Sequence, residues 1–167
     1  MIFVTIGTHE QPFNRLVKSL DTLKGNGIIQ EEVIIQTGYS TYQPQYCNWF
    51  KLLPYSQIIE FMDKAHIIIT HGGPSSFIMA LQRGKIPIVV PRQKKYGEHI
   101  NDHQLDFVKT INEKMENIIV IEDINDIKDI IQNYDSYVGQ INSSSFSNNQ
   151  LFLKNFELLV HKLLPQK

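Results

Sequence analysis

The stretch Ile67-Ile68-Ile69-Thr70-His71-Gly72-Gly73-Pro74-Ser75-Ser76-Phe77 decides the fold that this sequence predicts. A run of β-branched residues ends at a polar turn with two glycines, and a helical pattern follows directly. In α/β proteins this arrangement often binds phosphate, because the amides of the first helical turn lack partners and the helix dipole favours an anion. Ser75 or Ser76 is expected to cap the helix or to donate to a ligand oxygen. The alternative is an ordinary βα turn without a ligand.

Apolar runs alternate with helical patterns on both sides of this stretch. Strands are predicted over residues 2–6, 33–37, 67–70, 86–90 and 118–121. Helices are predicted after Pro12, over residues 58–65, from Phe77 to Gly84, from near Asn101 onward and over residues 124–131. Strands that read as continuous apolar runs are typical of a parallel sheet covered by helices on both faces, so the predicted fold class is α/β. Residues 39–53 have no clear period and are expected to be irregular.

The chain is expected to contain one domain and a C-terminal extension. Residues 1–138 form the predicted domain, residues 139–150 a polar linker, and residues 151–167 a final helix. That helix has a wide apolar side, which consists of Leu151, Phe152, Phe156, Leu159, Val160, Leu163 and Leu164. It is expected either to pack on its own domain or to dock on another subunit.

Composition narrows the classes of function. The 167 residues are 42% hydrophobic, which suffices for one core, and the net charge of -1 gives no reason to expect nucleic acid as a partner. The single cysteine, Cys47, excludes an internal disulfide framework and is expected to be structural. Neither a signal-peptide pattern nor an apolar run of about 20 residues is visible. We therefore expect a soluble, cytoplasmic protein.

Four polar segments follow predicted strands. These segments are Gly7-Thr8-His9, Gly38, His71-Gly72-Gly73 and the loop Arg92–Gln104. Because the carboxyl ends of parallel strands meet at one edge of a sheet, and ligands bind outside that edge, the four segments are expected to converge on one site.

Several kinds of chemistry are weakly supported at this site. His99 and His103 are four residues apart with Glu98 adjacent, but this pairing needs a helix where a loop is predicted, and no HExxH motif is present. A metal site is therefore not expected. The G-x-S-x-G motif of serine hydrolases, the GxGxxG dinucleotide motif and the P-loop motif are also absent. An unrelated hydrolase or phosphatase stays an alternative without an evident nucleophile.

The remaining interpretation is a site for a nucleotide-like diphosphate, held by glycine turns, hydroxyl groups and helix N-termini. Arg92, Lys94 and Lys95 are expected either to offset the charge of the diphosphate or to form a solvated basic loop.

At this point the residues carry a resemblance to the C-terminal domain of glycosyltransferase family 28. The motifs that resemble it are Ile69–Ser76, Gly84-Lys85, Val89–Arg92 and Gly97–Gln104. The segment Val4–His9, with Phe13 and Leu16, resembles the start of the short, free-standing members of that family. Those members are catalytic subunits of two-component enzymes, which are split versions of a GT-B transferase. The chain is most similar to bacterial subunits that build capsular or exopolysaccharide repeat units, often as β-1,4-galactosyltransferases.

The resemblance implies a Rossmann-like domain equivalent to the C-terminal, donor-binding half of a GT-B enzyme. The implied donor is a UDP-sugar, most often UDP-galactose, with UDP-N-acetylglucosamine or UDP-glucose as alternatives. The reaction would be inverting and independent of any metal or cofactor. The expected donor-binding residues are Gly7, Thr8, His71, Gly72, Gly73, Ser75, Ser76, Arg92, Glu98, His99, His103 and Gln104. Among them, His103 and Gln104 match the pair that contacts the donor sugar.

One departure from the family concerns the ribose. Many members carry a glutamate on the helix after the glycine turn, where it holds the ribose hydroxyls, whereas this chain has Met79. Either Glu98 or a main-chain group takes over this contact, or the affinity for nucleotide is reduced. Met79 also supports an alternative function, that of a non-catalytic nucleotide-sugar-binding or regulatory subunit.

The acceptor half of a GT-B enzyme is missing from these 167 residues. A membrane-anchored partner subunit is expected to bring a lipid-linked acceptor, to dock against the C-terminal helix, and to recruit the chain to the inner face of the cell membrane. Without this partner the apolar helix is expected to promote self-association. His9 is the candidate catalytic base, because a histidine titrates near neutral pH, although a cap or a phosphate contact is the structural alternative.

Overall fold

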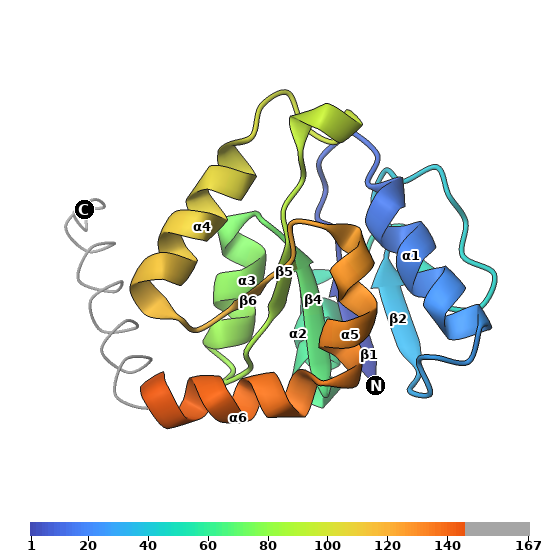
Figure 1. Ribbon diagram of the computed structural model, residues 1–167. Helices are drawn as coiled ribbons and strands as arrows, with labels where there is room; N and C mark the ends of the chain where they lie inside the picture. Colours follow the sequence, from blue (N-terminus) through green and yellow to red (C-terminus); the bar gives the residue numbers. More distant parts are fainter. Residues whose placement is uncertain (146–167) are drawn as a thin grey trace, which may run out of the picture.

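Six short parallel strands form the centre of the computed structural model, which describes residues 1–145 (Figure 1). The strands are β1 (Ile2–Thr5), β2 (Val33–Gln36), β3 (Asn48–Phe50), β4 (Ile67–His71), β5 (Ile88–Val90) and β6 (Ile119–Val120). Their order across the sheet is β3-β2-β1-β4-β5-β6, and every neighbouring pair is parallel. This is the Rossmann order, in which the direction of chain progression reverses between β1 and β4. The predicted α/β fold with a parallel sheet is confirmed.

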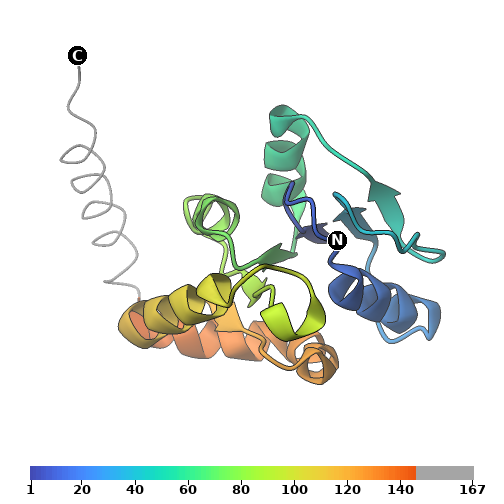
Figure 2. The ribbon, with the colours of Figure 1, turned by 90° about the horizontal axis from the view of Figure 1, so that it is seen from above.

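Helices cover both faces of the sheet. They are α1 (Asn14–Gly25), α2 (Tyr55–Lys64), α3 (Pro74–Leu81), α4 (His103–Met115), α5 (Ile127–Gln132) and α6 (Tyr134–Ser145), with the 3-10 turns η1 (Lys94–Tyr96) and η2 (Ile124–Asp126). Seen from above, α1 and α5 lie on one side of the sheet, and α2 and α3 lie on the other (Figure 2). The expectation of helices on both faces is therefore confirmed.

The two central strands are buried on both faces, which explains their continuous apolar runs. Phe3 pairs with Ile68 and packs toward α2 and α3, whereas Val4 pairs with Ile69 and packs toward α1 and α5. All four side chains are fully buried. A strand buried on both faces has no polar side to alternate with its apolar side, so it reads as an uninterrupted hydrophobic stretch.

The segment predicted to be irregular contains an additional strand. Within residues 39–53, Asn48–Phe50 form β3, which pairs with β2 at the edge of the sheet. All three residues of β3 are exposed. Because their side chains enter no core, they carry no hydrophobic pattern that marks a strand.

Asp21 on α1 holds the segment that leads into β3. Its buried carboxylate accepts hydrogen bonds from the Tyr42 hydroxyl at 2.8 Å and from the amides of Gln45 at 2.9 Å, Tyr46 at 2.8 Å and Cys47 at 3.0 Å. Burial alone would raise the pKa of Asp21, but these hydrogen bonds outweigh burial and leave the pKa below its usual value. One side chain on α1 therefore anchors a distant stretch of irregular backbone.

Replacing this carboxylate should destabilise the fold. We expect Asp21→Asn to lower the free energy of unfolding by about 3 kcal/mol at neutral pH, because an amide leaves buried N–H groups without acceptors. A folded-state pKa below the unfolded one gives stability that is present above the unfolded pKa and lost as the pH falls, so the deficit should shrink in acid. Urea unfolding measures both effects. The control is Asp63→Asn, at an exposed ion pair with Arg83, and equal losses in the two variants would contradict this account.

The polar linker predicted over residues 139–150 is helical in its first part. The helix α6 continues through Ser145, and residues 146–150, like the final helix predicted over 151–167, lie outside the described residues. The start of α6 is fixed to the sheet, because the buried Tyr134 hydroxyl donates to the carbonyl of Ile86 at 2.7 Å. Asp135 also contacts His66 at 2.8 Å. The division into a domain, a linker and a final helix stays a prediction.

Smaller differences concern where helices begin. Pro12 was expected in the first turn of the first helix, but this helix begins at Asn14 with Phe13 at its N-cap, so Pro12 lies before it. The helix predicted over residues 58–65 begins at Tyr55, and the one predicted from near Asn101 begins at His103. In the part of the chain that the structure describes, no helix is long and apolar enough to cross a membrane.

Candidate functional site

A hollow of about 500 Å³ lies at the carboxyl edge of the sheet, where β1 and β4 end. This edge is at the top of Figure 1, and it is the topological switch point at which α/β sheets bind ligands. The lining residues come from the ends of β1, β2 and β4 and from α2 and α3: Thr5, Gly7, Thr8, His9, Gln36, Ile58, Met62, His71, Ser75, Ser76 and Met79. We call this hollow the switch-point pocket.

Most of the predicted site residues line the switch-point pocket or a second hollow, whereas Gly73, Arg92, Glu98 and His99 line neither. Gly7, Thr8, His9, His71, Ser75 and Ser76 line the switch-point pocket. Gly72, His103 and Gln104 line a hollow of about 310 Å³ with Pro74 and Phe107. The two hollows share the glycine turn between β4 and α3, because successive residues of that turn line one or the other. Convergence of the loops after β1, β4 and β5 was thus predicted correctly, whereas Gly38, after β2, packs against the Gly7 carbonyl but lines a different hollow.

His71 occupies the centre of the glycine turn. Its Nδ1 accepts a hydrogen bond from the Gly73 amide at 2.9 Å, so the ring proton must lie on Nε2, which donates to Ser76 Oγ at 3.0 Å. Burial, together with the smaller effect of the positive charge of Arg92, lowers the pKa of His71 to about 4. The imidazole is therefore neutral at physiological pH, and the hydroxyl proton of Ser76 is left to donate elsewhere.

The expected serine cap of α3 is not formed. Gly73 occupies the N-cap position, Pro74 begins the helix, and no side chain caps it. Ser75 and Ser76 lie in the first helical turn, where proline contributes no N–H group. The serines are therefore available to the pocket instead of to the helix end.

The ring of His71 packs against glycines from two loops. A Cβ on Gly7 would lie 2.5 Å from His71 Nε2, and a Cβ on Gly73 would lie 2.1 Å from His71 Cε1. Gly7 also has a φ of +74°, which side-chain-bearing residues rarely adopt. Only glycine at both positions lets the loops after β1 and β4 close around one imidazole.

This packing predicts the outcome of two matched alanine substitutions. Gly84 has a φ of +68° and no atom within 4 Å of its ideal Cβ, so Gly84→Ala should lose only the cost of a left-handed backbone, about 1 to 2 kcal/mol. Gly7→Ala should lose clearly more free energy of unfolding, because its methyl group also displaces His71. Thermal and urea unfolding of the two variants test this difference. Equal losses would mean that Gly7 is required for its backbone conformation alone.

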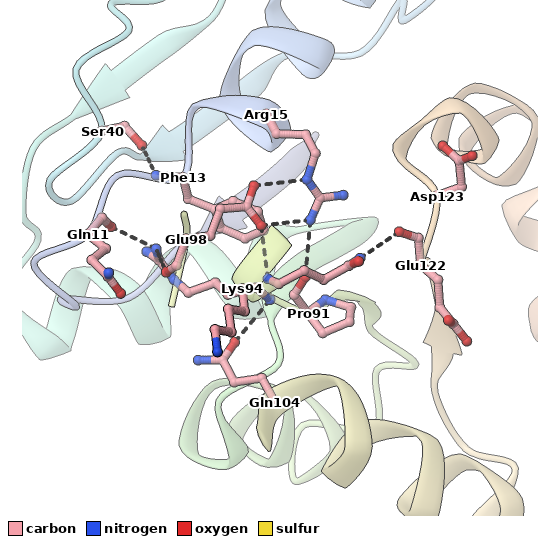
Figure 3. Close-up of polar contacts among 12 residues, drawn as sticks. Gln11, Phe13, Arg15, Ser40, Pro91, Lys94, Glu98, Gln104, Glu122 and Asp123 are labelled. Carbon is pink, nitrogen blue, oxygen red and sulfur yellow. Dashed lines mark hydrogen bonds and ion pairs between the residues drawn. The ribbon is translucent and has the colours of Figure 1, made fainter. Parts of the chain in front are cut away.

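Arg92 and Glu98, both expected to contact the donor, lie instead in the interior. The fully buried Arg92 guanidinium donates through Nη1 to the carbonyl of Gln11 at 2.7 Å and to that of Glu98 at 3.1 Å, and through Nη2 to the carbonyl of Ile6 at 3.0 Å. The Glu98 carboxylate accepts hydrogen bonds from Nε and Nη2 of Arg15, both at 2.9 Å (Figure 3). Neither side chain lines either hollow. Their charged groups are hydrogen-bonded to other groups of the same domain, because the loops after β1 and β5 close over them.

His9 and His99 form a second link between these loops. Their rings stack with centroids 4.7 Å apart and planes inclined by 20°, and His9 Nε2 lies 3.0 Å from Gln11 Oε1. His9 lines the switch-point pocket, whereas His99 does not line it and stacks on His9. Lys94 and Lys95 are exposed, as the solvated-loop interpretation predicts.

Some lining residues were missed by sequence reasoning. Thr5 and Gln36 are buried at the ends of β1 and β2, and their side chains share a hydrogen bond of 3.1 Å. The signal for them is a polar residue that ends an otherwise apolar strand. Ile58 and Met62 come from α2 and, with Met79, give the pocket an apolar wall that local patterns do not indicate.

Two other kinds of chemistry gain no support from the geometry. Within residues 1–145, no group of three or more histidine, cysteine, aspartate or glutamate side chains is arranged to hold a metal ion. Cys47 is buried, and burial raises the pKa of its thiol to about 12, so the reactive thiolate is scarcely formed at neutral pH.

Residues 1–133 match the family model of the glycosyltransferase family 28 C-terminal domain. The chain belongs to this family. Among solved structures, it is similar to the glycotransferase of kitacinnamycin, with 14% identity, a TM-score of 0.56, and coverage of 98% of this chain and 43% of that one. A second similar structure is the glycosyltransferase SnogD from Streptomyces nogalater, with 18% identity, a TM-score of 0.48, and coverage of 72% and 31%. No curated protein sequence matches this chain.

The chain spans less than half of each of these two glycosyltransferase structures. Its family and its six-stranded parallel sheet identify it as a Rossmann-like domain equivalent to the C-terminal half of a GT-B glycosyltransferase. Within this family, the domain has a nucleotide-sugar-binding role in glycosyl transfer.

Proposed function

We propose that this family 28 domain binds a UDP-sugar in the switch-point pocket and is the catalytic subunit of an inverting, metal-independent glycosyltransferase. The observation that carries the proposal is the closure of two glycine turns around His71, next to the N-terminus of α3. The diphosphate would lie at the N-terminus of α3, beside the Ser75 amide and the Thr8 and Ser75 hydroxyls, and would accept a hydrogen bond from the Ser76 hydroxyl, whose proton is free to donate. The donor sugar would extend toward His103 and Gln104.

The proposed reaction is one displacement at the anomeric carbon. An acceptor hydroxyl oxygen forms a bond to C1 of the sugar as the bond from C1 to the UDP oxygen breaks, so the configuration inverts and the bonding electrons leave with UDP. The helix dipole of α3 and the loop amides stabilise the developing negative charge. His9, which lines the pocket beside Gly7, is the proposed base that takes the acceptor proton.

The acceptor side requires a partner in this proposal. Because the chain resembles the catalytic subunits of two-component transferases, we propose that a membrane-anchored subunit binds a lipid-linked acceptor and completes the active site at the inner face of the membrane. By resemblance to subunits of capsular and exopolysaccharide synthesis, UDP-galactose is the proposed donor, and UDP-N-acetylglucosamine is the alternative.

One observation favours a second candidate function. Met79 lines the switch-point pocket, so a thioether stands where the family resemblance leads one to expect the carboxylate that holds the ribose. Glu98 does not replace it, because Arg15 binds both of its oxygens. A weakened ribose contact suits a non-catalytic nucleotide-sugar-binding or regulatory subunit. UDP-sugar binding without turnover, with partner and acceptor supplied, would favour this alternative.

Calorimetric titration of the full chain tests the proposal. We expect UDP-galactose or UDP-N-acetylglucosamine to bind with the same affinity in the presence of a chelator. Ser76→Ala should weaken this binding by about tenfold, the loss typical of a hydrogen bond to a charged group. The control is Ser136→Ala, at an exposed position on α6, which should leave the affinity unchanged.

Three results would contradict the proposal. Failure of every uridine nucleotide to bind would remove the donor site, and binding that requires a divalent cation would overturn the metal-independent mechanism. Release of free sugar or phosphate without an acceptor would indicate a hydrolase instead.

A further inference from the structure

The buried cluster of Arg15, Glu98 and Arg92 carries an excess of positive charge. Arg15 and Glu98 neutralise each other through two hydrogen bonds of 2.9 Å. The hydrogen bonds of Arg92 go to carbonyl oxygens, and among the described residues its Nε has no partner. Two guanidinium groups and one carboxylate therefore leave one net positive charge in the interior.

An unpaired charge of this kind is costly to bury. Taking a guanidinium out of water without a carboxylate partner disfavours its charged form, and burial lowers the pKa of Arg92 to about 10, with Glu98 opposing this effect. The group stays protonated at neutral pH. Carbonyl dipoles and the face of the Phe13 ring, 4.8 Å from the guanidinium carbon, compensate the charge only in part.

The charge of Arg92 acts on the switch-point pocket from behind the loop. Arg92 donates to the carbonyls of Ile6 and Gln11, which flank the pocket-lining segment from Gly7 to His9. Its charge also acts on His71, which lines the same pocket. Electrostatic interactions through a water-excluded interior are screened less than those at the surface. The positive charge of Arg92 therefore raises the electrostatic potential in the switch-point pocket, where a ligand would bind.

We propose that Arg92 is a positioning residue that also supplies, without contact, the positive charge that makes the switch-point pocket selective for a diphosphate. This inference rests on the proposed function, because it concerns the same site. Hydrogen bonds from Arg92 hold the segment after β1 in the shape that lines the pocket. The charge of its guanidinium, unpaired in the protein alone, finds its counter-charge in the bound diphosphate.

Charge and shape are separable by comparing two ligands. A UDP-sugar carries the diphosphate, whereas uridine has the same nucleoside and no charge. If the role of Arg92 is purely structural, a substitution that disturbs the loop should lower the affinity for both ligands by the same factor. If its role is electrostatic, the substitution should lower the affinity for the UDP-sugar alone. A partial loss of folding stability would affect both ligands and so would not hide this difference.

The test measures the affinities of UDP-galactose and uridine for the full chain by NMR titration. We expect Arg92→Gln to lower the affinity for UDP-galactose by about tenfold or more, equivalent to about 1.4 kcal/mol of binding free energy, and to leave the affinity for uridine unchanged. Arg92→Lys, which retains the charge, should recover most of the affinity for UDP-galactose. The control is Lys128→Gln, which removes a positive charge at an exposed position on α5 that lines neither hollow, and should alter the binding of neither ligand.

A second variant tests the sign of the effect if Arg92→Gln does not fold. Glu98→Gln removes the negative charge of the cluster. It should raise the affinity for UDP-galactose and leave the affinity for uridine unchanged. Equal loss of both ligands in Arg92→Gln, or weaker UDP-galactose binding in Glu98→Gln with uridine unchanged, would overturn the inference. If the unaltered chain binds neither ligand, the proposed function fails instead.

Discussion

The parallel pairing of β1 with β4 is the constraint on which the rest of this structure depends. These strands are distant in sequence, and both are buried on two faces, so their register fixes where the loops that follow them emerge. Gly7 and Gly73 are thereby brought against one imidazole, that of His71. Because the chain reverses its progression across the sheet between these strands, helices do not cover this point, and a pocket forms there.

Two polar side chains, His71 and Arg92, give that pocket a defined shape. His71 is neutral and hydrogen-bonded on both ring nitrogens, so it fixes the glycine turn and orients Ser76. Arg92 binds the carbonyls on either side of the segment after β1 and ties it to the loop after β5. The proposed donor site thus depends on interior groups as much as on the residues that face a ligand.

Local sequence patterns predicted the features that arise locally or from burial. The apolar runs of β1, β2, β4 and β5, the glycine turn before α3 and the meeting of loops at one edge were all correct. The strand β3 was missed, because its residues are exposed and its approach is held by Asp21 on another element. The burial of Arg92 and Glu98 was also missed. Charged residues usually face water, and their partners Ile6, Gln11 and Arg15 are about 80 residues away in sequence.

In the proposed function, a diphosphate binds between the loops after β1 and β4. The most direct measurement is an amide-resolved NMR titration of the full chain with UDP-galactose. We expect the largest chemical-shift changes at the amides of Gly7, Gly73 and Ser76, and smaller changes at the amide of Gln104. Shifts confined to the exposed strand β3, or to the hollow between α4, β6 and α6, would contradict it.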